Sequence, residues 1–420
     1  MKQSVGLIHY SYPPVPGGVE HVIQRHARLL VNHGHFVRVV TGEGREADRR
    51  IELTCIPQLS SRCPQIVTAR QQLNRGTVPS NFAHIRAELA DLLYGFTKDL
   101  DVCMLHNVMT MHFNLPLTAA LAEILASPPS NTRFVVWCHD AARLNPDYTS
   151  SFPDVLHYPW SLLTIRHTPA TYVAISAYRR NQLAAVFGIS PDQIVVVPNG
   201  LDPYAFLDVS PAIRRLARDY QLASADLVLF FPTRLVRRKR IEEGILIVKE
   251  LQHLGLKVRF FVTALIDPHN ADSTAYLREL VQLIAQQRLT KHVILLHPQR
   301  HALGLTLSNK EIRDLYTLSD ALFITSSDEG FGLPVLEAGL TRLPVICSTH
   351  GPYAEVPDAE TMLFEPDDSP GLVAQRIAAF LRERRSTRFF KRILSDYAWE
   401  PIYHRHLAPL LDPAAKEQGV

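Results

Sequence analysis

The sequence lacks any long hydrophobic run, and that absence argues against a protein with membrane-spanning helices. No stretch reaches the roughly 18 consecutive apolar residues that a membrane-spanning helix needs. The opening stretch, MKQSVGLIHYSYPP, has one lysine and then prolines, so we expect neither a secretory signal nor a membrane span there. A peripheral contact with a membrane surface stays open.

An excess of charge of one sign is also missing, because 44 basic and 41 acidic residues leave a formal net charge of only +3. Proteins that bind nucleic acid usually carry a strongly basic face, so we expect no nucleic-acid partner. Cysteine is scarce and odd in number, without the close pairing of metal ligands: Cys55, Cys63, Cys103, Cys138 and Cys347. Free buried thiols in a reducing compartment are the simplest interpretation, which predicts a cytoplasmic protein.

What the sequence does contain is a series of short apolar runs separated by helical patterns. The first series reads SVGLIHY, FVRVVTG, DVCMLH, FVVWCHD, YVAIS and QIVVVPNG. Continuous runs of this length are typical of strands buried on both faces of a parallel sheet. The first helical pattern, VEHVIQRHARLLVNHG, keeps its apolar residues on one face and ends at Gly34. We therefore predict a doubly wound domain over residues 1–200.

A second series of the same kind begins after the break PNGLDP. It reads LVLFFPTRL, KVRFFVTA, HVILLHP, ALFITSS, PVICSTH and ETMLFEP, and predicts a second domain over residues 201–383. Residues 384–420 continue as helix and could pack back on either domain, the N-terminal one included. The expected fold class is α/β, with two Rossmann-like parallel sheets whose strand ends face a cleft.

The stretch SSDEGFGLPVLEAG carries two acidic residues around a glycine turn. Glu329 follows the expected end of a strand, and Glu337 lies one turn into the next helix. Gly330 and Gly332 allow close approach of the backbone to a ligand, and a helix N-terminus favours an anion. Carboxylates accept hydrogen bonds from hydroxyls, so the stretch suits a sugar attached to a phosphate. The alternative is a surface turn followed by a solvated helix glutamate.

A cationic stretch, PTRLVRRKR, follows the first strand of the second series. Arg234 falls at the end of that strand, and Lys239 falls just before the next helix. A guanidinium fork and a compact ammonium together suit the oxygens of a diphosphate. The alternative is a cationic surface loop, which is how we interpret the neighbouring Arg237, Arg238 and Arg240.

The first series contributes two further features. Gly17 and Gly18 open the first helix and would let the backbone approach a phosphate or sugar, although the pair alone indicates only a tight turn. His106 and His139 each come at the carboxyl end of a strand and so belong to one edge of the sheet. We take His139 as a candidate catalytic residue. For His106, a structural role and a role in acceptor binding both stay open.

Taken together, these stretches resemble the retaining nucleotide-sugar transferases of glycosyltransferase family 4, the group 1 transferases, which have the two-domain GT-B fold. The resemblance covers nearly the whole chain and is carried by GGVE, SAYRRNQL, VVVPNGLD, RLVRRK and DEGFGLPVLEAGLTRLPVICSTHGPYAEV. The last stretch is the most diagnostic. One departure is GLTRLP, where Arg342 stands in a run that the family often fills with small residues.

The resemblance implies a role for each candidate residue. Glu329 would contact the hydroxyls of the donor sugar, and Glu337 the ribose of the nucleotide. Arg234 and Lys239 would hold the diphosphate, while His139 would lie beside the reacting carbon. The remaining donor contacts would come from Gly17, Gly18, Gly330, Phe331, Gly332 and Leu333.

The expected function is therefore retaining transfer of a hexose, mannose or glucose, from GDP-mannose or UDP-glucose to a hydroxyl acceptor. The acceptor is an acidic small molecule, a glycan or a lipid-linked sugar; Arg143 and Asn145, after His139, hint at an acidic one, although a solvated loop explains them equally well. No metal-ligand set is visible, so we expect no required cofactor, with a divalent ion such as magnesium as an optional aid. Two alternatives stay open: a nucleotide-sugar epimerase of the same fold, and a non-catalytic sugar-nucleotide binding protein.

Overall fold

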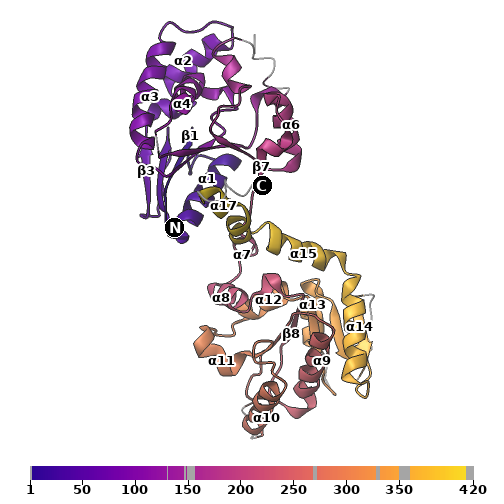
Figure 1. Cartoon of the computed structure of the whole chain (residues 1–420). Coiled ribbons are helices and arrows are strands. Elements are labelled where there is room, and N and C mark those ends of the chain that lie inside the picture. The colour runs from indigo at the N-terminus through magenta and orange to yellow at the C-terminus, as the bar shows by residue number, and fades with distance from the viewer. Residues whose placement is uncertain are drawn as a thin grey trace. The chain divides into compact units, whose positions relative to one another are not determined.

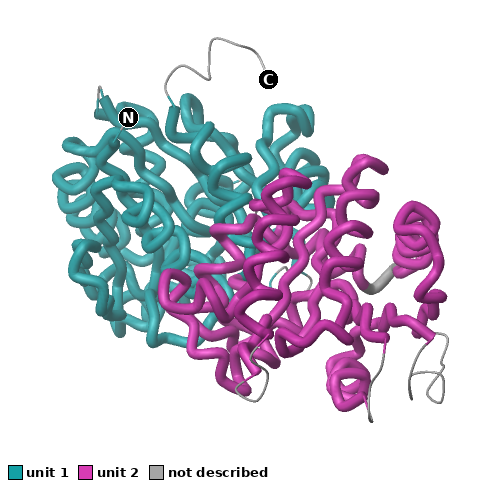
Figure 2. The backbone as a smooth tube through the Cα atoms, turned by 90° about the horizontal axis from the view of Figure 1, so that it is seen from below, with its two compact units in different colours: residues 1–201, 397–420 teal, residues 202–396 magenta. Residues whose placement is uncertain are grey.

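The computed structural model describes residues 2–129, 131–145, 148, 157–267, 272–327, 332–349 and 360–412. The chain folds as two compact units (Figures 1 and 2): unit 1 combines residues 1–201 with the C-terminal segment from 397, and unit 2 comprises residues 202–396. Each unit has its own parallel sheet and its own buried apolar core.

Unit 1 is built on a seven-stranded parallel sheet in its described residues, with the order β3-β2-β1-β4-β5-β6-β7. The strands are β1 (Ser4–His9), β2 (Phe36–Thr41), β3 (Ile51–Cys55), β4 (Val102–His106), β5 (Arg133–Cys138), β6 (Thr171–Ala174) and β7 (Ile194–Val196). The helices between them are α1 (Gly18–Asn32), α2 (Pro64–Leu73), α3 (Phe82–Thr97), α4 (Leu115–Ala126) and α6 (Ala177–Phe187).

Both faces of this sheet are covered, which explains why its central strands read as continuous apolar runs. Leu7 and Ile8 are consecutive on β1 and point to opposite faces, yet both are fully buried. Leu7 packs in one core cluster with Ile23 of α1, and Ile8 packs in another with Ile85 of α3. A sheet buried on both faces leaves its strand ends as the exposed edges where polar side chains gather.

The C-terminal segment belongs to unit 1, although it follows unit 2 in the sequence (Figure 2). It contains α16 (Trp399–Ile402), a π-helical turn (Tyr403–Leu407) and α17 (Ala408–Leu411). The backbone N–H of Leu201 donates to the carbonyl of Tyr397 over 2.9 Å, so the departing and returning chains lie side by side. Gly200 is required here, because a Cβ at that position would come within 2.7 Å of the Trp399 ring.

Unit 2 contains a six-stranded parallel sheet in its described residues, with the order β10-β9-β8-β11-β12-β13. The strands are β8 (Leu227–Phe231), β9 (Val258–Val262), β10 (Val293–Leu295), β11 (Ala321–Ile324), β12 (Val345–Ser348) and β13 (Thr361–Phe364). The helices are α7 (Pro203–Phe206), α8 (Pro211–Asp219), α9 (Ile241–His253), α10 (Ser273–Gln286), α11 (Leu296–Leu303), α12 (Asn309–Leu318), α13 (Leu333–Leu340), α14 (Pro370–Arg382) and α15 (Arg385–Asp396).

The expected fold class, two doubly wound parallel sheets, is confirmed, and two details differ from the expectation. Strand β3 was not expected, because IELTC lies at the sheet edge and only Ile51 in it is buried. The expected boundary at residue 384 also differs from the observed one, since α15 belongs to unit 2 and the return to unit 1 begins at Tyr397. Lys391 of α15 is anchored in unit 2 by an ion pair of 2.9 Å with buried Asp320.

Within the described part of the chain, no helix combines the length and apolar character that crossing a bilayer requires. All five cysteines are free thiols. The compartment stays a prediction.

Candidate functional site

In unit 1, polar side chains gather where the strand order reverses. Strands β2 and β3 lie on one side of β1, and β4 to β7 lie on the other, so β1 and β4 flank the switch point where open α/β sheets bind ligands. His9 ends β1, His106 ends β4, and His139 follows β5. Three imidazoles therefore come together at the carboxyl edge of three neighbouring strands.

His139 is held at this edge by a second histidine. Its side chain is 6% exposed, and its Nε2 lies 3.1 Å from Nδ1 of His106, with the two rings nearly parallel. Burial, and to a lesser degree the charges of His26 and His9, lowers the pKa of His139 well below its usual value. His139 is therefore a neutral imidazole at neutral pH, able to donate or accept one hydrogen bond toward a ligand but not to supply a fixed charge.

The backbone around His139 is fixed by Asn107, which the sequence analysis did not single out. Asn107 follows β4 in the left-handed region at φ 60°, and its N–H donates to the Trp137 carbonyl over 2.9 Å. Its Oδ1 accepts from the backbone N–H groups of His139 at 2.8 Å and Asp140 at 3.1 Å. An asparagine directly after a strand, in VCMLHN, was the available signal. The Asp140 carboxylate accepts from the backbone N–H of Ala141 over 2.8 Å and pairs with Arg179 at 3.3 Å.

Replacing Asn107 by alanine is expected to lower kcat about tenfold or more, because the two backbone amides lose their acceptor and His139 shifts. The free energy of unfolding should also fall by about 1–3 kcal/mol. Asn107→Gly keeps the left-handed backbone without strain but lacks the acceptor, so it should be as slow as the alanine variant while being more stable. Steady-state kinetics with melting curves checks this, and wild-type kcat in both variants would rule out the positioning role.

His106 is more deeply buried than we expect of a residue that contacts the acceptor. Its side chain is 0% exposed and stacks on Trp137 with ring centroids 5.4 Å apart. Burial, followed by the charge of His139, lowers the pKa of His106 well below its usual value. Its burial and its contact with His139 favour a positioning role for His106 over direct contact with the acceptor.

Beneath these residues lies His26 of α1, which is fully buried and has no hydrogen-bond partner for either ring nitrogen among the described residues. Its ring packs edge-on against Trp137 and Trp399. Burial lowers the pKa of His26 to about 3. Below about pH 6.5, the usual pKa of histidine, the unfolded chain takes up protons that folded His26, His106 and His139 do not. The free energy of unfolding therefore falls as the pH drops from about 6.5.

The variant His26→Phe is expected to lose stability less steeply on acidification, by about 1.4 kcal/mol per pH unit below pH 6. At pH 7 it should be at least as stable as the wild type, because two unpartnered buried nitrogens are removed. Urea denaturation at pH 7 and pH 5 measures both effects, with the exposed-site variant His84→Gln as control. Equal pH dependence in wild type and His26→Phe would refute this assignment.

The glycine pair lies where it was expected, between β1 and α1. Gly17 is the N-cap residue of α1 with extended backbone, Gly18 begins the helix, and both are exposed. Glu20, in the first turn, accepts from the Ser11 hydroxyl at 2.7 Å and lies 3.8 Å from Nε2 of His9. Burial alone would raise the pKa of Glu20, but the nearby His9 imidazole and the hydrogen bond from Ser11 outweigh it, so this pKa is lowered. Glu20 is thus a carboxylate at the same edge as His139.

Arg143 and Asn145 follow His139 in a short helical turn, Ala142–Leu144, and the residue after it. Arg143 is exposed, and Asn145 is half-buried. The backbone N–H of Ala142 donates to the Thr110 carbonyl over 2.9 Å, which ties this turn to the residues after β4. Contact of Arg143 or Asn145 with an acceptor stays a prediction.

In unit 2 the corresponding switch point lies between β8 and β11, which are neighbours in the sheet. Lys239 ends a short helical turn after β8 and is only 9% exposed. The Thr325 hydroxyl donates to the Lys239 carbonyl over 2.9 Å, and the Ser327 N–H donates to the Arg238 carbonyl over 2.8 Å. The cationic stretch after β8 is therefore fastened to the end of β11, directly before Glu329 in the sequence.

Arg234 lies earlier in the same connection and is more open, with 61% of its side chain exposed. Its guanidinium is 3.7 Å from a carboxylate oxygen of Asp267. A cation already loosely paired at the surface can exchange that partner for a phosphate at small cost, because exposed ion pairs are weak. Arg237, expected to be solvated, is instead paired with Asp272 and Glu279 while remaining half-exposed.

Helix α13 supplies the N-terminus expected from the glycine turn. Gly332 is its N-cap residue at φ 88°, a left-handed conformation that favours glycine, and Leu333 is 60% exposed. Glu337 is exposed, and its Oε2 accepts from the Tyr316 hydroxyl at 2.6 Å. The sequence analysis missed Tyr316, because it lies on α12 and is separated from Glu337 in the sequence by the whole of strand β11. Glu329, Gly330 and Phe331 lie outside the described residues, so their roles stay predictions.

Comparison with known proteins matches each unit to a family model. Residues 16–204 match Glycosyltransferase Family 4, and residues 213–393 match Glycosyl transferases group 1. A mannosylglucosylglycerate synthase from Thermotoga maritima is 22% identical over 366 residues, covering 81% of this chain and 79% of that protein. An MMP alpha-(1->4)-mannosyltransferase from Mycolicibacterium hassiacum is 29% identical over 55% of this chain, which spans about half (51%) of that relative.

Among solved structures, sucrose-phosphate synthase (tll1590) from Thermosynechococcus elongatus aligns with 97% of this chain at 16% identity, with a TM-score of 0.38. The assignment of the family does not depend on that alignment. It rests on the two family models, which between them account for most of the chain, and on the two doubly wound parallel sheets. The chain therefore belongs to the group 1 glycosyltransferases of glycosyltransferase family 4, and it is a glycosyltransferase with the GT-B fold.

Proposed function

We propose that the protein is a retaining hexosyltransferase that moves mannose or glucose from GDP-mannose or UDP-glucose to a hydroxyl acceptor. The Thermotoga maritima relative is named for both mannosyl and glucosyl groups, and the Mycolicibacterium hassiacum relative for mannosyl transfer, which supports a hexose of this kind. Retention follows the family that the chain resembles, in which the departing phosphate helps to deprotonate an acceptor attacking from the same face.

The observation that carries the proposal is the position of Lys239. Lys239 is buried, and its backbone carbonyl accepts from the Thr325 hydroxyl just after β11, so we expect its ammonium to be a preorganised charge at the carboxyl edge of the sheet. When the bond between sugar and phosphate breaks, negative charge grows on the leaving diphosphate. A fixed cation there stabilises the transition state more than the ground state. Arg234 and the N-terminus of α13 would add to this field.

The remaining roles follow from the local contacts. Glu337, oriented by the Tyr316 hydroxyl, would accept hydrogen bonds from the ribose, and Glu329 from the sugar hydroxyls. Neutral His139 would contact the sugar near its reacting carbon without placing a positive charge beside a cation-like transition state. Gly17 and Gly18, exposed at the start of α1, would meet the donor through backbone groups.

For the acceptor, we propose an acidic molecule with a free hydroxyl. Arg143 is an exposed cation four residues after His139 on the same edge of the sheet. The name of the Thermotoga maritima relative contains glycerate, a carboxylate with hydroxyl groups, which agrees with an acceptor of this class.

A thermal-shift screen against GDP, UDP, GDP-mannose and UDP-glucose tests the donor, because a ligand that binds only the folded state raises Tm. The donor that raises Tm is then incubated with hydroxy acids and sugar phosphates, and the anomer of the product is read by NMR. A product that keeps the α configuration supports the proposal. Conversion of the donor sugar without any acceptor would indicate an epimerase, and binding without turnover would indicate a binding protein; either result overturns it.

A further inference from the structure

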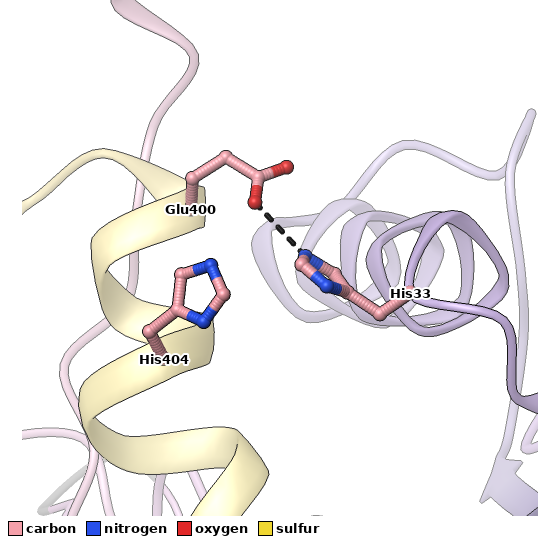
Figure 3. A group of neighbouring side chains, drawn as sticks. All are labelled: His33, Glu400 and His404. Carbon is pink, nitrogen blue, oxygen red and sulfur yellow. Dashed lines mark hydrogen bonds and ion pairs between the residues drawn. The ribbon is translucent and has the colours of Figure 1, made fainter. Parts of the chain in front are cut away.

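We propose that His33, Glu400 and His404 form a binding site for a divalent transition-metal ion, with Zn²⁺ as the best match. The ligand atoms that these side chains offer all lie within 4.8 Å of one another. Figure 3 shows the three side chains directed toward a common point, His33 from the end of α1 and the other two from the C-terminal helical segment. Two imidazoles and one carboxylate are a ligand set typical of zinc.

The distances are close to those that an ion needs. Nε2 of His33 lies 2.9 Å from Oε2 of Glu400, and the rings of His33 and His404 lie edge to face with centroids 5.1 Å apart. Ligand atoms around a tetrahedral ion with bonds of about 2.0–2.1 Å are roughly 3.3 Å apart, so small side-chain rotations are enough. The remaining position faces solvent, because Glu400 is 60% exposed, and water would fill it.

The packing around His33 supports the proposal that the three residues form a binding site. The ring of Tyr403 stacks on His33 at 3.6 Å between centroids, and its hydroxyl lies 2.9 Å from Nε2 of His35. Tyr403 itself is 6% exposed and belongs to the core cluster of unit 1. His33 is also the C-cap residue of the 15-residue α1, where the helix dipole favours a cation. His33 is therefore held by a packed neighbour, while Glu400 and His404 are exposed beside it.

The position of the site separates it from the proposed transfer chemistry. Helix α1 starts at the carboxyl edge of the sheet and runs back about 22 Å, so His33 lies near the amino end of β2. His139 lies at the opposite edge of the same sheet. Since His33 and Glu400 are 367 positions apart in sequence, a bound ion would fasten the C-terminal segment onto unit 1.

The test uses the full chain without a histidine tag, stripped with chelator and titrated with ZnCl₂ and NiCl₂ in a calorimeter. The wild type should bind one ion at this site. Glu400→Gln and His404→Gln should each weaken binding about tenfold or more, and the double variant His33→Gln/His404→Gln should abolish it. His84→Gln is the matched control. His84 and Glu88 form an exposed pair 3.3 Å apart and, like Glu400 and His404, are four residues apart in the sequence. They belong to no three-ligand group among the described residues.

The effect of zinc on the melting temperature provides a second test. Zn²⁺ should raise the Tm of the wild type and of His84→Gln, each relative to its own Tm in chelator, but should not raise that of the double variant. Unchanged zinc affinity in the Glu400 and His404 variants overturns the site. An equal loss of affinity in His84→Gln overturns it as well, because binding would then be a general property of surface histidines.

Discussion

Replacing Lys239 by alanine is expected to slow sugar transfer about a hundredfold to a thousandfold while the protein remains folded. The magnitude is that of removing one preorganised group from the place where charge develops in a transition state. Lys239 is 9% exposed, so water cannot easily take the place of its ammonium. Its backbone contacts with Thr325 involve the carbonyl and survive the substitution, which is why the fold should persist.

The measurement is the initial rate of nucleoside diphosphate release with the donor and acceptor found in the screen. Binding of GDP or UDP, measured by calorimetry, should weaken in parallel and needs no acceptor. Lys249→Ala is the control, since it removes the same charge from α9 of the same unit and should leave both rate and binding near wild type. Undiminished diphosphate binding by Lys239→Ala would contradict the role given to this residue. By resemblance, Glu329→Ala should also abolish transfer.

The second large effect is expected at His139. His139→Ala should lower kcat about a hundredfold, because hydrogen-bonding side chains positioned at the reacting group typically contribute rate factors of this size. Nucleotide binding should change only a few-fold, since His139 belongs to unit 1 and the proposed diphosphate groups to unit 2. A melting curve checks that loss of the contact with His106 has not unfolded unit 1.

The pH profile separates this role from that of a charged histidine. Burial holds the pKa of His139 well below its usual value. The pH dependence of kcat near pH 6.5 should therefore be the same in the wild type and in His139→Ala. An inflection near pH 6.5 that is lost in the variant would show that His139 titrates during turnover. The neutral assignment would then be wrong.

The sequence predicted the sheets well because their central strands are buried on both faces and read as apolar runs. Leu7 and Ile8 are the simplest example, since neither can face water. Strand β3 was missed for the converse reason: an edge strand with one buried residue has no such run. The helical pattern after residue 384 predicted helices but not their partner, because the docking of Trp399 against Gly200 depends on residues almost 200 positions apart.

The candidate site was predictable where it follows strand ends. Lys239 and His139 were predicted to lie at the carboxyl edge of a sheet because each follows a buried strand, and that location is observed, while their roles in the site stay predictions. The supporting residues were not predicted, since Asn107 fixes His139 through backbone amides of another strand connection, and Tyr316 reaches Glu337 from α12. Such contacts are set by the packing of elements and leave no local pattern.

The central claim is that the cationic connection after β8 and the N-terminus of α13 hold the diphosphate of a sugar nucleotide. A crystal structure of the protein with GDP or UDP bound tests it most directly. The account predicts diphosphate oxygens about 3 Å from Nζ of Lys239, with Arg234 released from Asp267 toward the phosphates and the ribose hydroxyls at Glu337. A nucleotide bound with its diphosphate away from Lys239, with Arg234 still paired to Asp267, would contradict it.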